Sequence, residues 1–156
     1  MAGDAIFHAM QMHGSCAARN GAGVLLIGPS GAGKSDLLLR LLDRGFVLVA
    51  DDRVDISDGC ASPPAVLAGL LEVRGLGLLR LPHLPRARLA LVVTLGGRMD
   101  RLPQPARHPV LDLPMIVLDP FAASAAQRVE LALDCAQGRR EALAGAFAAG
   151  DMGTVT

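Results

Sequence analysis

The stretch "GPSGAGKS", residues 28–35, matches the phosphate-loop pattern G-x-x-x-x-G-K-S/T in full. It follows the apolar run "VLLIG" and precedes "KSDLLLRLLDRG", in which leucines 37, 38, 41 and 42 form one buried helix face that Gly45 would end. A strand, a glycine-rich loop and a helix N-terminus together form a site for phosphate. We predict that nucleotide phosphates are bound by Gly28, Pro29, Ser30, Gly31, Ala32, Gly33, Lys34 and Ser35.

Two residues of this loop have further predicted roles. Lys34 would bridge phosphates, and the Ser35 hydroxyl would bind magnesium. Lys34 is also the one lysine among fifteen basic residues, and its compact ammonium fits between phosphates where a planar guanidinium is too wide. The alternative is an unrelated glycine-rich turn before an amphipathic helix.

Two adjacent acids, Asp51 and Asp52, follow the apolar run "FVLVA", which is typical of a strand buried on both faces. Neighbouring side chains of a strand point to opposite faces, so the two acids are predicted to have different roles. One would hold magnesium or its waters, and the other would accept a hydroxyl proton. Which acid does which stays open, and a solvated strand end is the alternative for both.

Three other features favour plain structural readings when they are taken alone. Glu72, beside Arg74, is more readily explained by a surface ion pair. His13, before the loop, is more often structural than catalytic in such a position. The arginine-rich segment 74–107 contains Arg101 and is explained for the most part by a solvated face.

The remaining patterns predict an α/β fold in a single domain over residues 1–156. A turn at Asn20 and Gly21 would join a strand in residues 5–14 to the strand before the phosphate loop. Residues 58–69 are predicted to be a surface connection and 96–114 a loop. Further predicted elements are strands over residues 88–95 and 114–120 and an alanine-rich helix over 122–149, which Gly138 can divide.

Composition narrows the class of protein. A chain that is 51% hydrophobic and 19% charged can bury a core, and no apolar run is long enough to span a bilayer. Without a secretory signal at its start, the chain is expected to be cytoplasmic, and its three scattered cysteines reduced. A net charge of zero gives no reason to expect nucleic acid or a membrane as a partner.

Several motifs, taken together, resemble one family. These are "HG" at 13–14, the phosphate loop, "RG" at 44–45, "LVADDRVDI" at 48–56, "LLEVRGLGLL" at 70–79 and "MDRL" at 99–102. Their order resembles the catalytic domain of HPr kinase/phosphorylase, from about residue 13 to about residue 128. The chain would be a short form without the additional N-terminal domain that family members commonly carry.

The resemblance implies an ATP- and magnesium-dependent protein kinase that phosphorylates a serine of HPr, the phosphocarrier of the sugar phosphotransferase system. It implies a phosphate-loop fold akin to phosphoenolpyruvate carboxykinase, and a homo-oligomer is one option because the family is oligomeric. By motif, His13, Lys34, Asp51, Asp52 and Arg101 would be catalytic, and Ser35 and Glu72 would bind magnesium.

One departure bears on the reaction direction. The family has a "PGRN"-like loop tied to dephosphorylation, and this chain has "LDPFAASAAQR" at 118–128, which retains only the proline. Phosphorylase activity is therefore doubtful. Two other functions are alternatives: a regulatory module that senses ATP or phosphate and acts through a partner, and a small-molecule phosphate-loop kinase.

Overall fold

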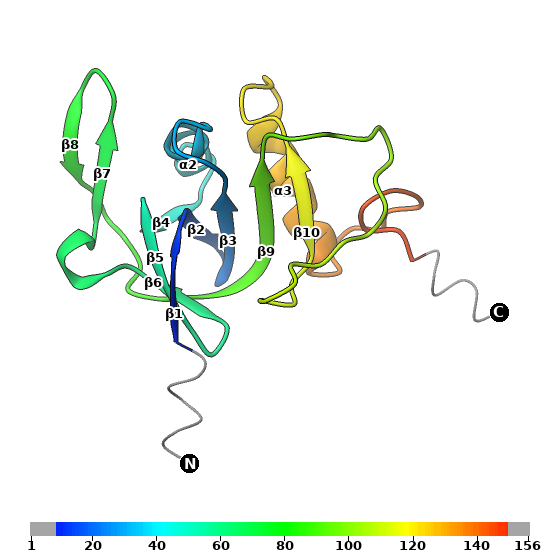
Figure 1. Ribbon diagram of the computed structural model, residues 1–156, viewed down its shortest axis with the longest axis horizontal. Helices are drawn as coiled ribbons and strands as arrows, with labels where there is room; N and C mark the ends of the chain where they lie inside the picture. Colours follow the sequence, from blue (N-terminus) through cyan, green and yellow to red (C-terminus); the bar gives the residue numbers. More distant parts are fainter. Residues whose placement is uncertain (1–8, 150–156) are drawn as a thin grey trace, which may run out of the picture.

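The strand that enters the phosphate loop, β3 (Ala22–Ile27), lies inside an eight-stranded mixed sheet of the order β1-β5-β6-β9-β3-β2-β4, with β10 paired to β9 (Figure 1). The structure, a computed structural model, describes residues 9–149. The other strands of this sheet are β1 (Met10–His13), β2 (Ser15–Arg19), β4 (Val47–Ala50), β5 (Arg53–Ser57), β6 (Cys60–Ser62), β9 (Ala87–Leu95) and β10 (Met115–Leu118).

The turn at Asn20 and Gly21 is confirmed, and both residues have positive φ, at 51° and 82°, as a tight hairpin turn requires. It joins β3 to β2, however, and not to the strand that begins before Gly14. That earlier strand is β1, which pairs antiparallel with β5. The first residues of the predicted strand, 5–8, lie outside the described residues.

Strand alternation produces two cores, one on each face of the sheet. Val24 and Leu26 pack into a cluster with both helices, α2 (Lys34–Leu42) and α3 (Ala125–Ala136). Leu25 lies between them in β3 and faces a second cluster, where the sheet curls so that β4 approaches β6. The leucines predicted to form the buried helix face are confirmed, since Leu37, Leu38 and Leu41 are fully buried and Leu42 packs against the same cluster.

Residues 47–50 of the run form β4, whose last three residues are buried as predicted although β4 is the edge strand of the sheet and Val47 is 36% exposed. Leu48 faces the first core cluster and Val49 the second. The edge is partly covered, because the Leu48 carbonyl accepts a hydrogen bond of 2.8 Å from the Leu84 N–H. The strand therefore holds Asp51, the residue after it, in a buried position.

Two predictions about elements are wrong. Residues 58–69 are not only a surface connection, because β6 pairs with β5 and β9 and buries Cys60 and Ala61. The alanine-rich helix ends at Ala136, well before residue 149. Gly138 has φ 74°, and the Arg139 N–H bonds to the Asp134 carbonyl at 2.8 Å, which closes the helix end.

Between β6 and β9 the chain forms a short 3₁₀ helix, η1 (Ala65–Leu67), and the hairpin of β7 (Leu70–Val73) and β8 (Gly77–Arg80). Figure 1 shows this hairpin standing apart from the main sheet, beside α2. Leu71 and Val73 pack into the first core cluster. The predicted strands at β9 and β10 and the loop over 96–114 are confirmed.

The described cysteines form no disulfide, as predicted. Burial raises the pKa of the Cys16 thiol to about 12, so this thiol stays protonated and unreactive at neutral pH. No described helix is both long enough and apolar enough to cross a bilayer.

Candidate nucleotide and acceptor site

The phosphate loop joins β3 to α2 at the carboxyl end of β3, and two of its glycines, Gly28 and Gly33, are required by close packing. A Cβ on Gly28 would lie 3.2 Å from the Leu95 carbonyl oxygen. Gly33 has φ 95°, and a Cβ there would lie 3.2 Å from both Pro120 and Phe121. Gly33 is also the N-cap of α2, where no side chain caps the helix, so the first-turn N–H groups are free to bind an anion.

Lys34 is 7% exposed and lies along this loop. Its Nζ donates hydrogen bonds to the carbonyl oxygens of Gly28, at 2.8 Å, and Pro29, at 3.0 Å. The ammonium is thus held over the loop itself, where a bound phosphate chain would meet it.

Asp51 is 9% exposed and is the centre of a group of hydroxyls. The Ser35 Oγ lies 3.0 and 3.1 Å from the two carboxylate oxygens of Asp51. The Ser15 Oγ donates a 2.6 Å bond to Asp51 Oδ1. Of the two adjacent acids, Asp51 is therefore the one that contacts the loop serine.

Sequence reasoning missed Ser15. It is fully buried at the start of β2, beside Leu26 of β3. The available signal was a hydroxyl residue at the beginning of the otherwise apolar run "SCAA", directly after Gly14. A buried hydroxyl needs a hydrogen-bond partner, and Asp51 provides it.

Asp52 faces a different partner. Its Oδ1 lies 3.1 Å from His13 Nε2, with the side chains 65% and 52% exposed respectively. The two acids do diverge as predicted, but not because of strand alternation. Both lie in the turn between β4 and β5, where Asp52 has φ 71° and the Asp51 carbonyl accepts the Arg53 N–H at 2.8 Å.

Gly14 connects β1 to β2 and holds His13 beside this turn. Its N–H donates to the Asp52 carbonyl at 3.1 Å, and a Cβ on Gly14 would lie only 2.8 Å from the Leu26 carbonyl oxygen. In the "HG" dipeptide, the glycine is therefore required by close packing, and the histidine makes a polar contact with Asp52.

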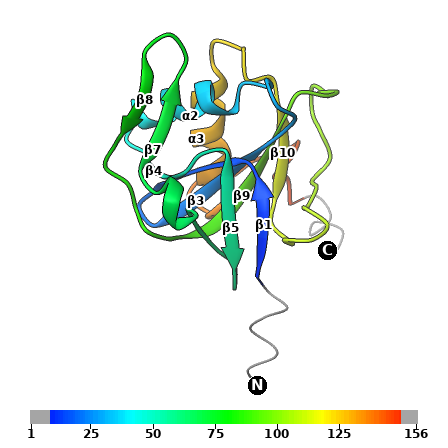
Figure 2. The same cartoon turned by 60° about the vertical axis from the view of Figure 1, so that its left-hand side comes forward.

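A hollow of about 280 Å³ opens beside the His13–Asp52 pair. Its lining comes from β1, from the turn before β5 and from the start of β5, and Figure 2 shows β1 and β5 side by side. The lining residues are Gln11, Met12, His13, Asp52 and Arg53.

Two predicted site residues do not lie beside Asp51 and Asp52. Glu72 is exposed on β7, between Leu71 and Val73, whose side chains face the core. Arg101 is exposed in the 96–114 loop and makes no hydrogen bond or ion pair within residues 9–149. In the same part of the chain no three histidine, cysteine or acidic side chains cluster to hold a metal, so Glu72 does not join Asp51 and Asp52.

The fold and the site define an α/β protein with a phosphate loop, a hydroxyl–carboxylate pair at its end and a histidine–carboxylate pair next to it. The model of the family described as "HPr Serine kinase C-terminal domain" matches residues 4–85, more than half of the chain. The chain belongs to this family, as its motifs predicted.

Curated relatives of similar sequence carry the name of the same family. A HPr kinase/phosphorylase of Clostridium tetani is 46% identical over 78 residues, covering 47% of this chain and 26% of the relative. That of Cupriavidus metallidurans is 42% identical over 124 residues, covering 67% of this chain and 38% of the relative. The chain thus spans between a quarter and two fifths of the length of these curated relatives.

A solved structure supports the fold. The Hpr(Ser) kinase/phosphatase from Coxiella burnetii superposes with a TM-score of 0.66 at 23% identity, covering 79% of this chain and 97% of the other. This likeness concerns the α/β architecture.

Proposed function

We propose that this chain transfers the γ-phosphoryl group of ATP, with magnesium, to a serine of an HPr-like phosphocarrier protein. The observation that carries the proposal is the placement of two separate carboxylates next to one phosphate loop. Asp51 is engaged by the loop serine, and Asp52 by His13 beside an open hollow. The names of the relatives support the acceptor, because they are HPr kinases.

The residues fit a magnesium nucleotide. The free N–H groups at the start of α2 can donate hydrogen bonds to phosphate oxygens, and the Lys34 ammonium offers a positive charge to them. Ser35 and Asp51 offer oxygen atoms, which magnesium prefers, and a single carboxylate is sufficient because the ion also takes phosphate oxygens and waters. Bound there, magnesium would neutralise charge on the phosphates.

The two acids differ in a way that suggests their roles. Both oxygens of Asp51 accept hydroxyl hydrogen bonds, and the group is nearly buried. Asp52 is 65% exposed and has one side-chain partner, His13. We therefore assign proton acceptance to Asp52 and positioning of Ser35 to Asp51.

In the proposed reaction the acceptor serine enters the hollow. Its Oγ forms a bond to the γ-phosphorus, the bond from that phosphorus to the ADP oxygen breaks, and the seryl proton moves to Asp52. His13 holds the Asp52 carboxylate toward the hollow. Lys34 and the loop N–H groups stabilise negative charge on the phosphates during transfer.

Arg101 and Glu72 enter the proposal on the resemblance alone. Arg101 would act at the transferring phosphoryl group, and Glu72 would assist in magnesium binding. A cytoplasmic location, and the absence of nucleic acid or membrane from the partners, belong to the same proposal.

The test is to incubate the chain with ATP, magnesium and the host's own HPr and to locate phosphate by mass spectrometry. We expect one phosphoserine on HPr. Asp52→Asn should lower the turnover number by at least 100-fold, as loss of a general base does, without weakening ATP binding. Asp58→Asn is the matched control, because Asp58 is exposed in the turn between β5 and β6, does not line the hollow, and has a positive φ of 54° that Asn tolerates. ATP binding without transfer to HPr would favour a regulatory module instead.

A further inference from the structure

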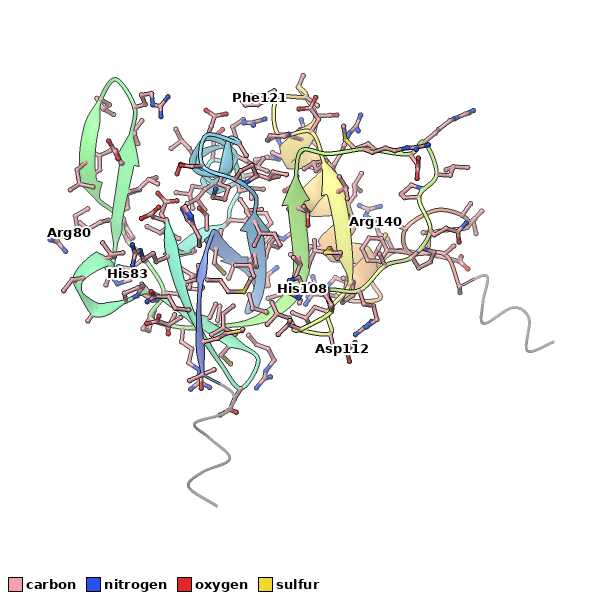
Figure 3. The ribbon with its side chains drawn as sticks, in the orientation of Figure 1. Arg80, His83, His108, Asp112, Phe121 and Arg140 are labelled. Carbon is pink, nitrogen blue, oxygen red and sulfur yellow. The ribbon has the colours of Figure 1, made fainter. Side chains whose placement is uncertain are left out.

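Phe121 is an exposed aromatic ring at the edge of the phosphate loop. It lies in the segment 119–124 between β10 and α3, and 71% of its surface is exposed. One end of the ring faces the loop, because its Cζ would lie 3.2 Å from a Cβ added at Gly33. Figure 3 shows Phe121 at the end of the molecule where the strands β3 and β9 terminate.

The backbone beneath this ring is tied to the helix that follows the phosphate loop. Arg40 of α2 donates hydrogen bonds to the Pro120 carbonyl and, at 3.4 Å, to the Ala122 carbonyl. The Asp119 carboxylate accepts the Phe121 N–H at 2.9 Å. The backbone that carries the ring is therefore held next to the helix that follows the loop by several hydrogen bonds.

An exposed phenyl ring in such a fixed place is poorly explained by packing. The part of it that contacts Gly33 is small, and the rest gains nothing from burial. Aromatic side chains are used for base stacking in proteins that bind single-stranded nucleic acids, and such a ring accepts any base because every base has a π-face. The ring is adjacent to the phosphate loop.

We propose that Phe121 is the stacking platform for the purine base of the nucleotide; this inference rests on the proposed function. This assignment defines how the nucleotide is oriented on the phosphate loop. The base lies over the β10 side of the phosphate loop, and the terminal phosphate extends toward Asp51 and Asp52 on the other side. The hollow at His13 is then left open for the acceptor protein.

The chain provides a direct optical test, because it contains no tryptophan and no tyrosine. Phe121→Trp introduces a single fluorophore at the proposed platform. We expect its emission to be quenched by magnesium ATP and to stay unchanged with magnesium tripolyphosphate, which has the phosphates without the base. Val66→Trp, at an 84% exposed position in η1, is the matched control and should respond to neither ligand.

Affinity measurements by calorimetry complete the test. Phe121→Ala should weaken ATP binding by about 5- to 150-fold, the range for losing one stacked base, and leave tripolyphosphate binding within 2-fold. Lys34→Ala should weaken both ligands. Equal losses of both ligands in Phe121→Ala, or no loss of either, would overturn the platform.

The unaltered chain separates this inference from the function on which it rests. We expect it to bind ATP more tightly than tripolyphosphate. Equal affinities for the two ligands would contradict the proposed base site but would be consistent with the phosphate site. Binding of neither ligand would overturn the proposed function together with the platform.

Discussion

At the residue scale, the position of Lys34 restricts both the charge and the shape of the side chain that can stand there. It is the one lysine of the chain, it is nearly buried, and its Nζ contacts two carbonyls of the phosphate loop. A guanidinium carries the same charge but is planar and wider, so it cannot occupy the same space between two loop carbonyls. Charge alone therefore does not account for the lysine.

We expect Lys34→Ala to abolish phosphate transfer to HPr and Lys34→Arg to lower it by at least 10-fold. The fold should survive both changes, since the ammonium makes two hydrogen bonds to loop carbonyls, each contributing about 1.5–3 kcal/mol. Turnover and urea denaturation are the measurements. Full activity of Lys34→Arg would show that the shape of the ammonium is irrelevant.

Ser15 acts one step away from the phosphates, through Asp51. The 2.6 Å bond between its hydroxyl and the carboxylate is short and charge-assisted, and both groups are buried. Ser15→Ala should lower the free energy of unfolding by about 1–3 kcal/mol, because the carboxylate loses a buried donor.

The same variant should need more magnesium for half-maximal ATP binding, since Asp51 is then less firmly placed beside Ser35. Magnesium titrations at fixed ATP measure this effect. Ser57→Ala, at an exposed end of β5, is the control. A loss of stability with an unchanged magnesium requirement would limit Ser15 to a structural role.

Among the elements, α3 is joined to the sheet by charge as well as by its apolar face. Arg19 of β2 bonds to Glu130 at 3.2 Å and to Asp134 at 2.8 Å, and its guanidinium lies 5.1 Å from the centre of the Phe46 ring. Arg44, beyond the end of α2, also reaches Glu130, at 2.7 Å. The side chains of Arg19, Glu130 and Asp134 are each about one-fifth exposed. Solvent therefore screens the attraction between them less than it screens an exposed ion pair.

Arg19→Ala should therefore destabilise the fold by about 1–3 kcal/mol, between the effects of an exposed and a buried ion pair. The exposed pair of Arg98 and Asp100, with side chains 91% and 60% accessible, is the matched control, and Arg98→Ala should leave stability unchanged. Urea denaturation of both variants measures the difference. Equal effects would mean that partial burial adds nothing to the Arg19 network.

At the scale of the whole molecule, the site is assembled where the curled sheet brings separate strand ends together. Gly14 joins β1 to β2 and the two acids join β4 to β5, so His13 and Asp52 meet at the same edge as the phosphate loop. The segment after β10 packs on the other side of that loop, at Gly33. The proposed nucleotide and the proposed acceptor would approach from opposite sides.

This arrangement bears on the direction of the reaction. Phosphorolysis of a phosphoserine needs inorganic phosphate to be held and activated near the transferred group. The segment 119–124 offers no basic side chain, and two guanidiniums that contact it make hydrogen bonds to it: Arg40 to the Pro120 and Ala122 carbonyls, and Arg128 to the Ser124 hydroxyl at 2.9 Å. We therefore expect a kinase with weak or no phosphorylase activity.

The measurement supplies serine-phosphorylated HPr, magnesium and millimolar phosphate without ATP, and follows pyrophosphate and free HPr. Little of either should form over the time in which the forward reaction is complete. Rapid release of both products would show that Lys34, Asp51 and Asp52 are sufficient in both directions.

The local patterns of this sequence were enough to predict the phosphate loop, the helix after it, the hairpin turn at Asn20 and Gly21, and the strands β4, β9 and β10. Each depends on contacts within a few residues: glycines that permit positive φ, leucines at helical spacing, and apolar runs between turns. The family could be recognised for the same reason, since its motifs are short and contiguous.

Only the tertiary structure decided which residues meet across the sheet. Ser15 and Asp51, or His13 and Asp52, are far apart in the chain and become neighbours through strand order and sheet curvature. Whether residues 60–62 form a strand depended on β5 and β9 being present to pair with them. Such contacts are set by the packing of the whole chain, and no local pattern contains them.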